Sequence, residues 1–342
     1  MKQTNHTRHL LSPRLRPARL SLVIPLYNEE AMIAFLRGAI DNFVRTLWGD
    51  VELILVNDGS SDQTLSLLAE WAASDDRVRV LHLSRNFGHQ IAATAGLDHA
   101  SGDAIVLLDA DLQDPLRVIH QMIDRYCEGY DVVYGQRKSR AGESSYKRFT
   151  AWAFYRIMRS LVYRELPPDV GDFRLVSRSC LDAVILMRET HRFLRGMVAW
   201  VGFPQVAVSY CREARVAGST KYPLRKMLAF SWIAATSFST LPLRLSMIFG
   251  AIVGILGMEE GIRAALAHVL GWYTVPGWTS LTVLVSLIGS ALLISIGILG
   301  EYVAKLYEQS KGRPLYIVAR TFGGHSTISP KTREWDAAVH AE

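Results

Sequence analysis

Three aspartates lie close together directly after a short apolar run in the first half of the chain. The run Ala104–Leu108 is typical of a buried strand, and Asp109 and Asp111 alternate along the extended backbone after it, so both side chains can point the same way. Such a pair suits Mg²⁺ or Mn²⁺, because these ions bind few carboxylates and complete their shells with water and phosphate. The pair therefore predicts a divalent-metal site. The stretch could also be a turn that starts a helix, with Asp114 as N-cap and Pro115 at its first position. The two interpretations are compatible, because Asp114 can cap while Asp109 and Asp111 bind the metal.

Polar clusters also follow three apolar runs upstream, and each cluster leads into a helical pattern. Four successive strand–helix units favour a mainly parallel sheet with helices on both faces. In such a sheet, polar groups after successive strands converge on one crevice. One cluster could be turn chemistry alone, but four together predict a binding site in a Rossmann-like α/β domain. The predicted strands are 20–26, 51–56 and 77–83, followed by the clusters Tyr27–Glu30, Asn57–Asp62 and Ser84–Gly88.

The stretch from the acidic pair to residue 222 combines further elements with basic loops. Within it, Val170–Val176 places Asp172 and Arg174 beside a glycine. The basic residues of this stretch could bind phosphates or be ordinary solvated surface charges. The expected elements are helices at 117–128 and 147–163, a strand at 131–134, a helix and a strand up to about 210, and glycine-containing basic loops at 135–140 and 215–222.

The composition indicates membrane segments, because 49% of the 342 residues are hydrophobic. Leu281–Gly300 is a run of twenty residues without a charge, long enough to cross a bilayer. A second apolar stretch before it is interrupted by Glu259 and Glu260, which are costly within a membrane span. We expect two transmembrane helices, at about 244–270 and 279–300. The first could instead be a buried helix of a soluble protein.

Charge predicts how this hairpin lies in the membrane. The link 271–280 contains no Lys or Arg, whereas both flanks do, so the positive-inside rule puts both termini in the cytoplasm. The amphipathic, aromatic segment 223–243 is expected to form interfacial helices on the membrane surface. Residues 1–19 carry five basic residues and no acid. They are expected to form a disordered basic tail, with contact to anionic lipid as the alternative, and residues 301–342 a cytoplasmic tail.

The polar clusters together resemble family 2 glycosyltransferases. Their order and spacing are similar to the polyprenyl-phosphate branch, which includes dolichyl-phosphate mannose synthases, and three later motifs look like the bacterial bactoprenol glucosyltransferases. The resemblance covers about residues 20–318. Processive members carry a Gln-x-x-Arg-Trp motif, which His191–Gly196 lacks, so a polymerising synthase is not expected. The motifs are Ile24–Glu30, Asn57–Asp62, Ser84–Gly88 and Asp109–Pro115, then Val170–Leu175, Ser237–Arg244 and Gly297–Tyr302.

The resemblance implies a GT-A catalytic domain over residues 20–222, a UDP-sugar donor, an undecaprenyl-phosphate acceptor, Mg²⁺ or Mn²⁺, and often a homotetramer. It implies no nucleic-acid partner. The expected reaction is inverting sugar transfer at the cytoplasmic face of the bacterial inner membrane, for cell-envelope glycan modification. Glucose is the first candidate, and N-acetylhexosamine, galactose, mannose and aminoarabinose remain open. Rival functions are a nucleotide-binding membrane scaffold without catalysis and a transporter component.

The same resemblance assigns roles to residues. Asp172 corresponds to the family's candidate base or acceptor-positioning acid. Because a phosphate monoester is largely dianionic at neutral pH, with a second pKa of about 6, we expect Asp172 to position the acceptor more than to remove a proton. The remaining implied residues are Asp109, Asp111 and Gln113 for the metal; Pro25, Tyr27, Asn28, Glu29, Asp58, Asn86, Gly88 and Asp109 for the donor; and Arg137, Arg148, Arg174, Arg215 and Lys221 for phosphates of acceptor or donor.

Overall fold

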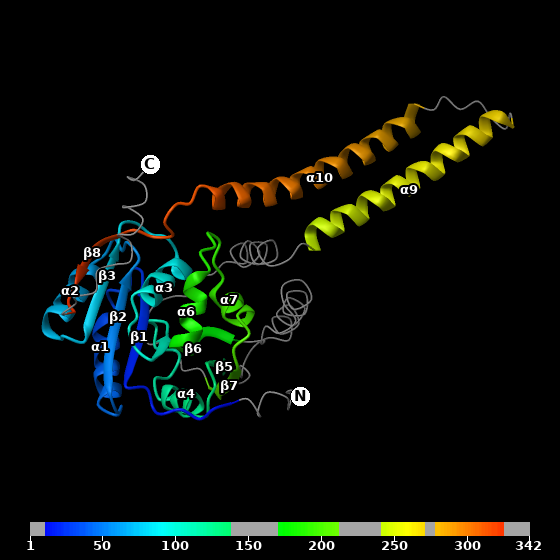
Figure 1. Cartoon of the computed structure of the whole chain (residues 1–342). Helices are drawn as coiled ribbons and strands as arrows, with labels where there is room; N and C mark the ends of the chain where they lie inside the picture. The colour runs from blue at the N-terminus through cyan, green and yellow to red at the C-terminus, as the bar shows by residue number, and fades with distance from the viewer. Residues whose placement is uncertain (1–10, 138–169, 212–240, 271–277, 325–342) are drawn as a thin grey trace, which may run out of the picture.

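The structure is a computed structural model that describes residues 11–137, 170–211, 241–270 and 278–324 (Figure 1). Several predicted features lie outside these ranges: the helix at 147–163, nearly all of the interfacial segment 223–243, most of the link 271–280, and the basic residues Arg148, Arg215 and Lys221.

The first half of the chain forms the four predicted strand–helix repeats. Strands β1 to β4 pair in parallel in the order β4-β1-β2-β3, so their carboxyl ends meet at one edge of the sheet. β1 and β2 are buried except at their first residues, because helices cover both faces of the sheet. The elements are β1 (Arg19–Leu26), α1 (Ile33–Val44), β2 (Asp50–Asn57), α2 (Thr64–Ser74), β3 (Val78–Leu83), α3 (His89–Asp98), β4 (Ala104–Leu107), α4 (Val118–Cys127) and β5 (Val132–Arg137).

An antiparallel strand, β6 (Val170–Ser177), enters the sheet between β4 and β5. No strand is predicted here from the sequence, because Asp172 and Arg174 interrupt the apolar pattern, yet both are buried. β5 reaches Arg137, so the predicted loop at 135–140 begins as a strand. The chain continues with α6 (Arg178–Leu186), α7 (Leu194–Trp200) and β7 (Gln205–Tyr210), where one helix and one strand are predicted, and β7 pairs in parallel with β5.

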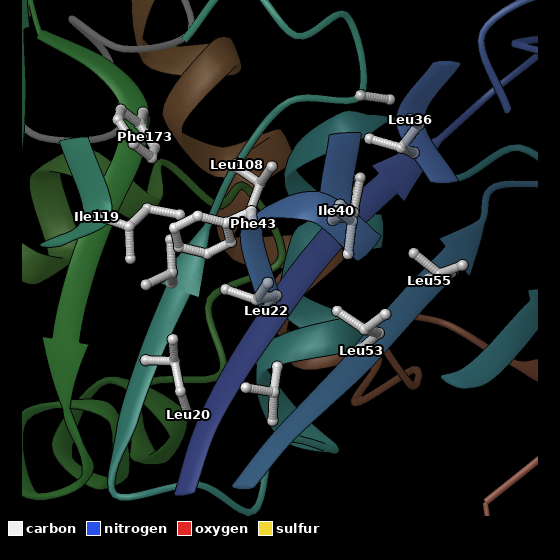
Figure 2. Packing of buried hydrophobic residues seen from close by; sticks show 14 of the residues in the cluster. Leu20, Leu22, Leu36, Ile40, Phe43, Leu53, Leu55, Leu108, Ile119 and Phe173 are labelled. Atoms are coloured by element: carbon white, nitrogen blue, oxygen red, sulfur yellow. The ribbon is translucent and has the colours of Figure 1, made fainter. Parts of the chain in front are cut away.

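Two hydrophobic cores flank the sheet. On one face, α1, α2 and α4 pack against strand side chains such as Leu22, Leu53 and Leu55 (Figure 2). On the other face, α3, α6 and α7 pack against Val23 and Ile54. These two residues alternate with the leucines of the first face along β1 and β2. The sheet is therefore the middle of three layers, and polar groups gather at the edge where its parallel strands end.

The N-terminal segment is ordered where the structure describes it. The backbone N–H of Arg14 donates to the carbonyl of Cys127, and its guanidinium lies 3.0 Å from the Asp131 carboxylate and over the ring of Tyr126. Arg19 already belongs to β1. The predicted disordered tail at 1–19 is therefore wrong for residues 11–19, because paired arginines hold this segment on the domain.

The C-terminal part returns to the sheet. After α9 (Leu241–Val269) and α10 (Trp278–Ser310), the strand β8 (Val318–Phe322) pairs antiparallel with β3. The whole sheet has eight strands in the order β7-β5-β6-β4-β1-β2-β3-β8. The region predicted as a tail from residue 301 therefore contains the last turns of α10 and a strand. The catalytic sheet thus extends beyond the predicted boundary at residue 222.

The helices α9 and α10 lie side by side and extend away from the sheet (Figure 1). Within the described residues, one helical stretch, Leu287–Ser310, is long and apolar enough to cross a membrane. α9 offers only the shorter apolar stretch Leu245–Glu259, and the helix continues through Glu259 and Glu260 without a break. Both predicted helices are therefore present, but only α10 contains a described stretch with the length and composition of a membrane span.

The turn after β2 yields a test of the fold. Gly59 has φ +64°, and a Cβ there would lie 2.4 Å from the carbonyl carbon of Arg85 and 2.6 Å from the backbone nitrogen of Asn86. We expect Gly59→Ala to lower the free energy of unfolding by about 1–3 kcal/mol, the usual cost of a strained backbone. Gly38→Ala is the control, because a Cβ at that helical position meets nothing within 4 Å. Thermal unfolding of both variants measures the difference, and equal melting temperatures would contradict the described turn.

Candidate active site

The loops after β1 and β2 are joined by hydrogen bonds. The Asn28 backbone N–H donates to Ser60 Oγ at 3.0 Å, and the Ser61 N–H donates to Asn28 Oδ1 at 2.9 Å. Asn28 has φ +52°, a left-handed conformation that Asn tolerates better than most residues. These two loops therefore form one continuous rim at the carboxyl edge of the sheet.

Asp58 organises the neighbouring loop after β3. The buried carboxylate accepts hydrogen bonds from the N–H groups of Phe87 at 2.7 Å and Gly88 at 2.9 Å. Burial raises the pKa of Asp58, although the two amide hydrogen bonds oppose the rise. Asp58, predicted to contact the nucleobase, thus also fixes the loop that carries Asn86 and Gly88.

The other predicted donor-binding residues differ in exposure. Tyr27 and Asn86 are exposed at the rim, and the backbone N–H of Glu29 donates to Thr64 Oγ1 at 2.9 Å. Pro25 is buried within β1, so it contributes to the strand rather than to the open surface of the rim. The structure thus brings these residues to one edge of the sheet, with Pro25 buried in the strand that leads to it.

Asp109 and Asp111 lie in the turn directly after β4. Asp111 Oδ1 accepts from the Gln113 N–H at 3.2 Å, and Leu112 between them has φ +53°. Asp114 does not cap α4, because the N-cap residue is Arg117 and no side chain caps it. Instead, the Asp114 carboxylate accepts a hydrogen bond from the Tyr210 hydroxyl. The predicted N-cap role of Asp114 is therefore wrong.

The charges around Asp109 fit a divalent cation. Burial raises its pKa, and the nearby charges of Asp172, Asp114 and Asp111 raise it further, against the opposing effect of His89. Among the described residues, no group of three or more His, Cys, Asp or Glu side chains could hold a metal ion. A cation here would rely on two carboxylates, the Gln113 amide, water and a ligand phosphate, which is the usual manner of Mg²⁺ binding.

Asp172 lies at the start of β6, beside the acidic pair. His89 Nε2 bridges the two elements, 3.5 Å from Asp109 Oδ1 and 3.4 Å from Asp172 Oδ2. Arg195 Nε donates to Asp172 Oδ1 at 2.7 Å, and Gln90 Nε2 donates to Oδ2 at 3.1 Å. Burial alone would raise the pKa of Asp172, but the charge of Arg195 and the hydrogen bond from His89 hold it well below its usual range. Such a carboxylate is a weak base, which suits a positioning role.

Three of these groups, His89, Gln90 and Arg195, are absent from the residues predicted from the sequence. His89 and Gln90 open the helix that directly follows the cluster at 84–88, so a polar pair in that first turn was the available signal. Arg195 has no such signal, since it meets Asp172 across 23 residues of chain.

The predicted phosphate-binding arginines do not all reach the crevice. Arg137 is the last residue of β5, whose carboxyl end lies at the same edge as that of β4. Arg174 is buried, and its side chain donates to the carbonyl groups of Gly171 at 3.2 Å and Asp172 at 3.4 Å. Burial lowers the pKa of Arg174 to about 10. Arg174 is therefore held inside the domain, and binding a phosphate would require it to leave these carbonyls.

A mostly parallel sheet with an acidic pair directly after β4 is the arrangement of a GT-A-like fold. The model of the family described as glycosyl transferase family 2 matches residues 21–185. An uncharacterised glycosyltransferase of Bacillus subtilis (strain 168) is 42% identical over 90% of this chain and 95% of its own length.

Two further relatives are similar over nearly their whole length. An uncharacterised glycosyltransferase of Synechocystis sp. is 41% identical over 89% of this chain and 96% of its own. A prophage bactoprenol glucosyl transferase homolog of Escherichia coli (strain K12) is 38% identical over 88% of this chain and 99% of its own. The chain belongs to glycosyl transferase family 2 and is a glycosyltransferase.

The His89 bridge generates a pH-dependent prediction. Burial lowers the pKa of His89, but the hydrogen bond to Asp172 and the charge of Asp109 outweigh it, so the net pKa is raised. His89 therefore stabilises the metal-free site below its unfolded pKa of about 6.5, and this contribution is lost as pH rises through the folded pKa. Because the imidazolium repels a cation at Asp109, we expect Mn²⁺ affinity to rise with pH, by at most about tenfold per unit if one proton is released.

Mn²⁺ titration by electron paramagnetic resonance at about pH 6 and pH 8 measures this dependence. His89→Gln should flatten it. His120→Gln is the matched control, because that ring contacts Thr46 and Phe43 instead of the acids. A slope that survives in His89→Gln would assign the proton to another group.

Proposed function

We propose that the protein transfers a sugar from a UDP-sugar to undecaprenyl phosphate, with glucose as the first candidate sugar. The observation that carries the proposal is the chain-long similarity to a relative named as a bactoprenol glucosyl transferase homolog, 38% identical over 302 residues. The product, a sugar linked to a lipid phosphate, would serve modification of cell-envelope glycans. The same reaction with N-acetylhexosamine, galactose, mannose or aminoarabinose is the nearest alternative.

The donor would bind at the rim formed by the loops after β1, β2 and β3. Asp109, Asp111 and Gln113 would hold Mg²⁺ or Mn²⁺ on its diphosphate. When bound, the ion supplies Lewis-acid stabilisation of the charge that develops on the leaving diphosphate. Burial and the nearby charges of Asp172, Asp114 and Asp111 raise the pKa of Asp109, and this supports the assignment, since a bound cation would stabilise the ionised carboxylate.

Asp172 would orient the acceptor instead of removing a proton. An acceptor phosphate is largely dianionic at neutral pH, because its second pKa is about 6, and needs no general base. The low pKa of Asp172, caused by Arg195 and His89, supports the same view. Direct attack of the phosphate oxygen on an α-linked donor sugar would invert the anomeric carbon and give a β-linked product.

The helices α9 and α10 would form the membrane anchor of the enzyme, as two spans with both chain termini in the cytoplasm. This arrangement would bring the catalytic edge to the inner face of the plasma membrane, where the acceptor phosphate lies at headgroup level. Exposed apolar side chains along both helices, such as Met247 and Leu293, support burial in lipid. We further propose a homotetramer, from the resemblance to the family alone.

A transfer assay tests the reaction. The purified protein is incubated with undecaprenyl phosphate, Mg²⁺ or Mn²⁺ and a panel of nucleotide sugars, and the lipid product is read by mass and anomeric configuration. We expect a β-linked hexosyl product with UDP-glucose and a loss of at least about 100-fold in Asp109→Asn, since a metal ligand supplies several kcal/mol of transition-state stabilisation. Asp124→Asn is the control, because its carboxylate is exposed on α4.

The outcomes separate the competing functions. Release of UDP that depends on both metal and lipid supports transfer, whereas nucleotide binding without release would favour a scaffold. An α-linked product would contradict direct displacement.

The membrane arrangement is tested by labelling in intact cells. In variants whose native cysteines are replaced, Thr274→Cys lies in the link that carries no Lys or Arg, and Lys311→Cys directly follows α10. We expect a membrane-impermeant maleimide to label Thr274→Cys in intact cells and Lys311→Cys only after permeabilisation. Labelling of both, or of Lys311→Cys alone, in intact cells would contradict two spans with cytoplasmic termini.

A further inference from the structure

The C-terminal end of α10 holds a segment of the catalytic domain through one side chain. Gln309 Oε1 accepts hydrogen bonds from the backbone N–H and the hydroxyl of Thr190, both at 2.8 Å. Gln309 Nε2 donates to the carbonyl of Arg188 at 3.0 Å. Because two of these bonds go to main-chain atoms, Gln309 fixes the path of the chain between α6 and α7 rather than the rotamer of one side chain.

Neighbouring contacts hold the same segment from two sides. His191 Nε2 lies 2.7 Å from Glu308 of α10, and Arg188 lies 2.7 Å from the Asp98 carboxylate at the end of α3. The Tyr316 hydroxyl, which follows α10 in the chain, donates to the same Asp98 carboxylate at 2.9 Å. The segment is therefore held between α3 and the end of α10.

This segment leads directly into the groups that hold Asp172. The first residue of α7, Leu194, donates its backbone N–H to Gln90 Oε1 at 3.0 Å, and Gln90 donates in turn to Asp172 Oδ2 at 3.1 Å. The second residue, Arg195, donates to Asp172 Oδ1 at 2.7 Å. Both oxygens of the buried carboxylate thus depend on where α7 begins.

We propose that the end of α10 positions the Asp172 carboxylate through the segment 187–193, and that Gln309 is a positioning residue for sugar transfer. The link runs from Gln309 to Thr190, along four residues of chain to Leu194, and through Gln90 and Arg195 to Asp172. It couples an apolar helix to the acid at the site. The kinetic part of the inference rests on the proposed function, while the structural coupling does not.

The effect should appear in turnover and not in nucleotide binding. Misplacing a catalytic group by about 1 Å can cost about 100-fold in rate. We expect Arg195→Ala to lower kcat by about that factor, and Gln309→Ala by about five- to twentyfold, because the contacts of His191 and Arg188 remain. The dissociation constant for UDP should stay within about twofold in both, since the hydrogen bonds and ion pairs described for this segment tie it to α3 and α10 and not to the polar groups of the donor rim.

Two comparisons separate positioning from loss of fold. Ser310→Ala is the matched control, because within the described ranges its hydroxyl donates to the Tyr307 carbonyl of its own helix, and its kcat should be unchanged. If Gln309 acts through Arg195, the double variant Gln309→Ala/Arg195→Ala should be no slower than Arg195→Ala alone. Effects that multiply in the double variant would overturn the step through Arg195.

A second measurement needs no activity. Hydrogen–deuterium exchange of the peptide covering 187–195, without substrates, should be faster in Gln309→Ala than in the wild type and unchanged in Ser310→Ala. Unchanged exchange in Gln309→Ala would overturn the coupling. If the wild type transfers no sugar to undecaprenyl phosphate, the proposed function fails, and the exchange result still decides the coupling.

Discussion

The pairing of β4 with the antiparallel strand β6 is the constraint on which the site depends. The register places Leu107 opposite Arg174, so the strand that carries Asp172 runs beside the end of β4, and His89 Nε2 lies within 3.5 Å of both Asp109 and Asp172. Without this one antiparallel strand, the parallel half of the sheet would present its acidic pair and rim loops alone. The strand adds an acid to the crevice at a point where the chain has already left the strand–helix repeat.

Two carboxylates brought this close would repel each other, and the surrounding groups resolve the conflict unevenly. Arg195 and Gln90 donate hydrogen bonds to Asp172, whose pKa is held well below its usual range. The pKa of Asp109 is raised instead, by burial and by three acidic neighbours. Environments that push the pKa values of two acids apart give them different chemistry. Asp172 is thereby an ionised, fixed group, and Asp109 is the acid whose charge a ligand can neutralise.

Local pattern was enough to predict the repeats β1 to β4 and the acidic pair, because each depends on residues close together in the chain. What depends on distant partners could not be predicted. β6 and β8 are strands only because they pair with β4 and β3, which lie far away in the sequence. Arg174 is buried with its side chain bonded to the carbonyls of Gly171 and Asp172. The same holds for Arg14, whose pairing with Asp131 orders a segment that composition alone describes as disordered.

The place of β8 in the chain has a consequence for biosynthesis. β8 pairs with β3, yet residues 318–322 follow both long apolar helices in the sequence. A ribosome therefore releases the last strand of this sheet only after α9 and α10 have been made. Until then the edge of β3 stays open, and an open edge can pair with another chain. Completion of the catalytic sheet thus comes after the synthesis of both long helices that precede β8.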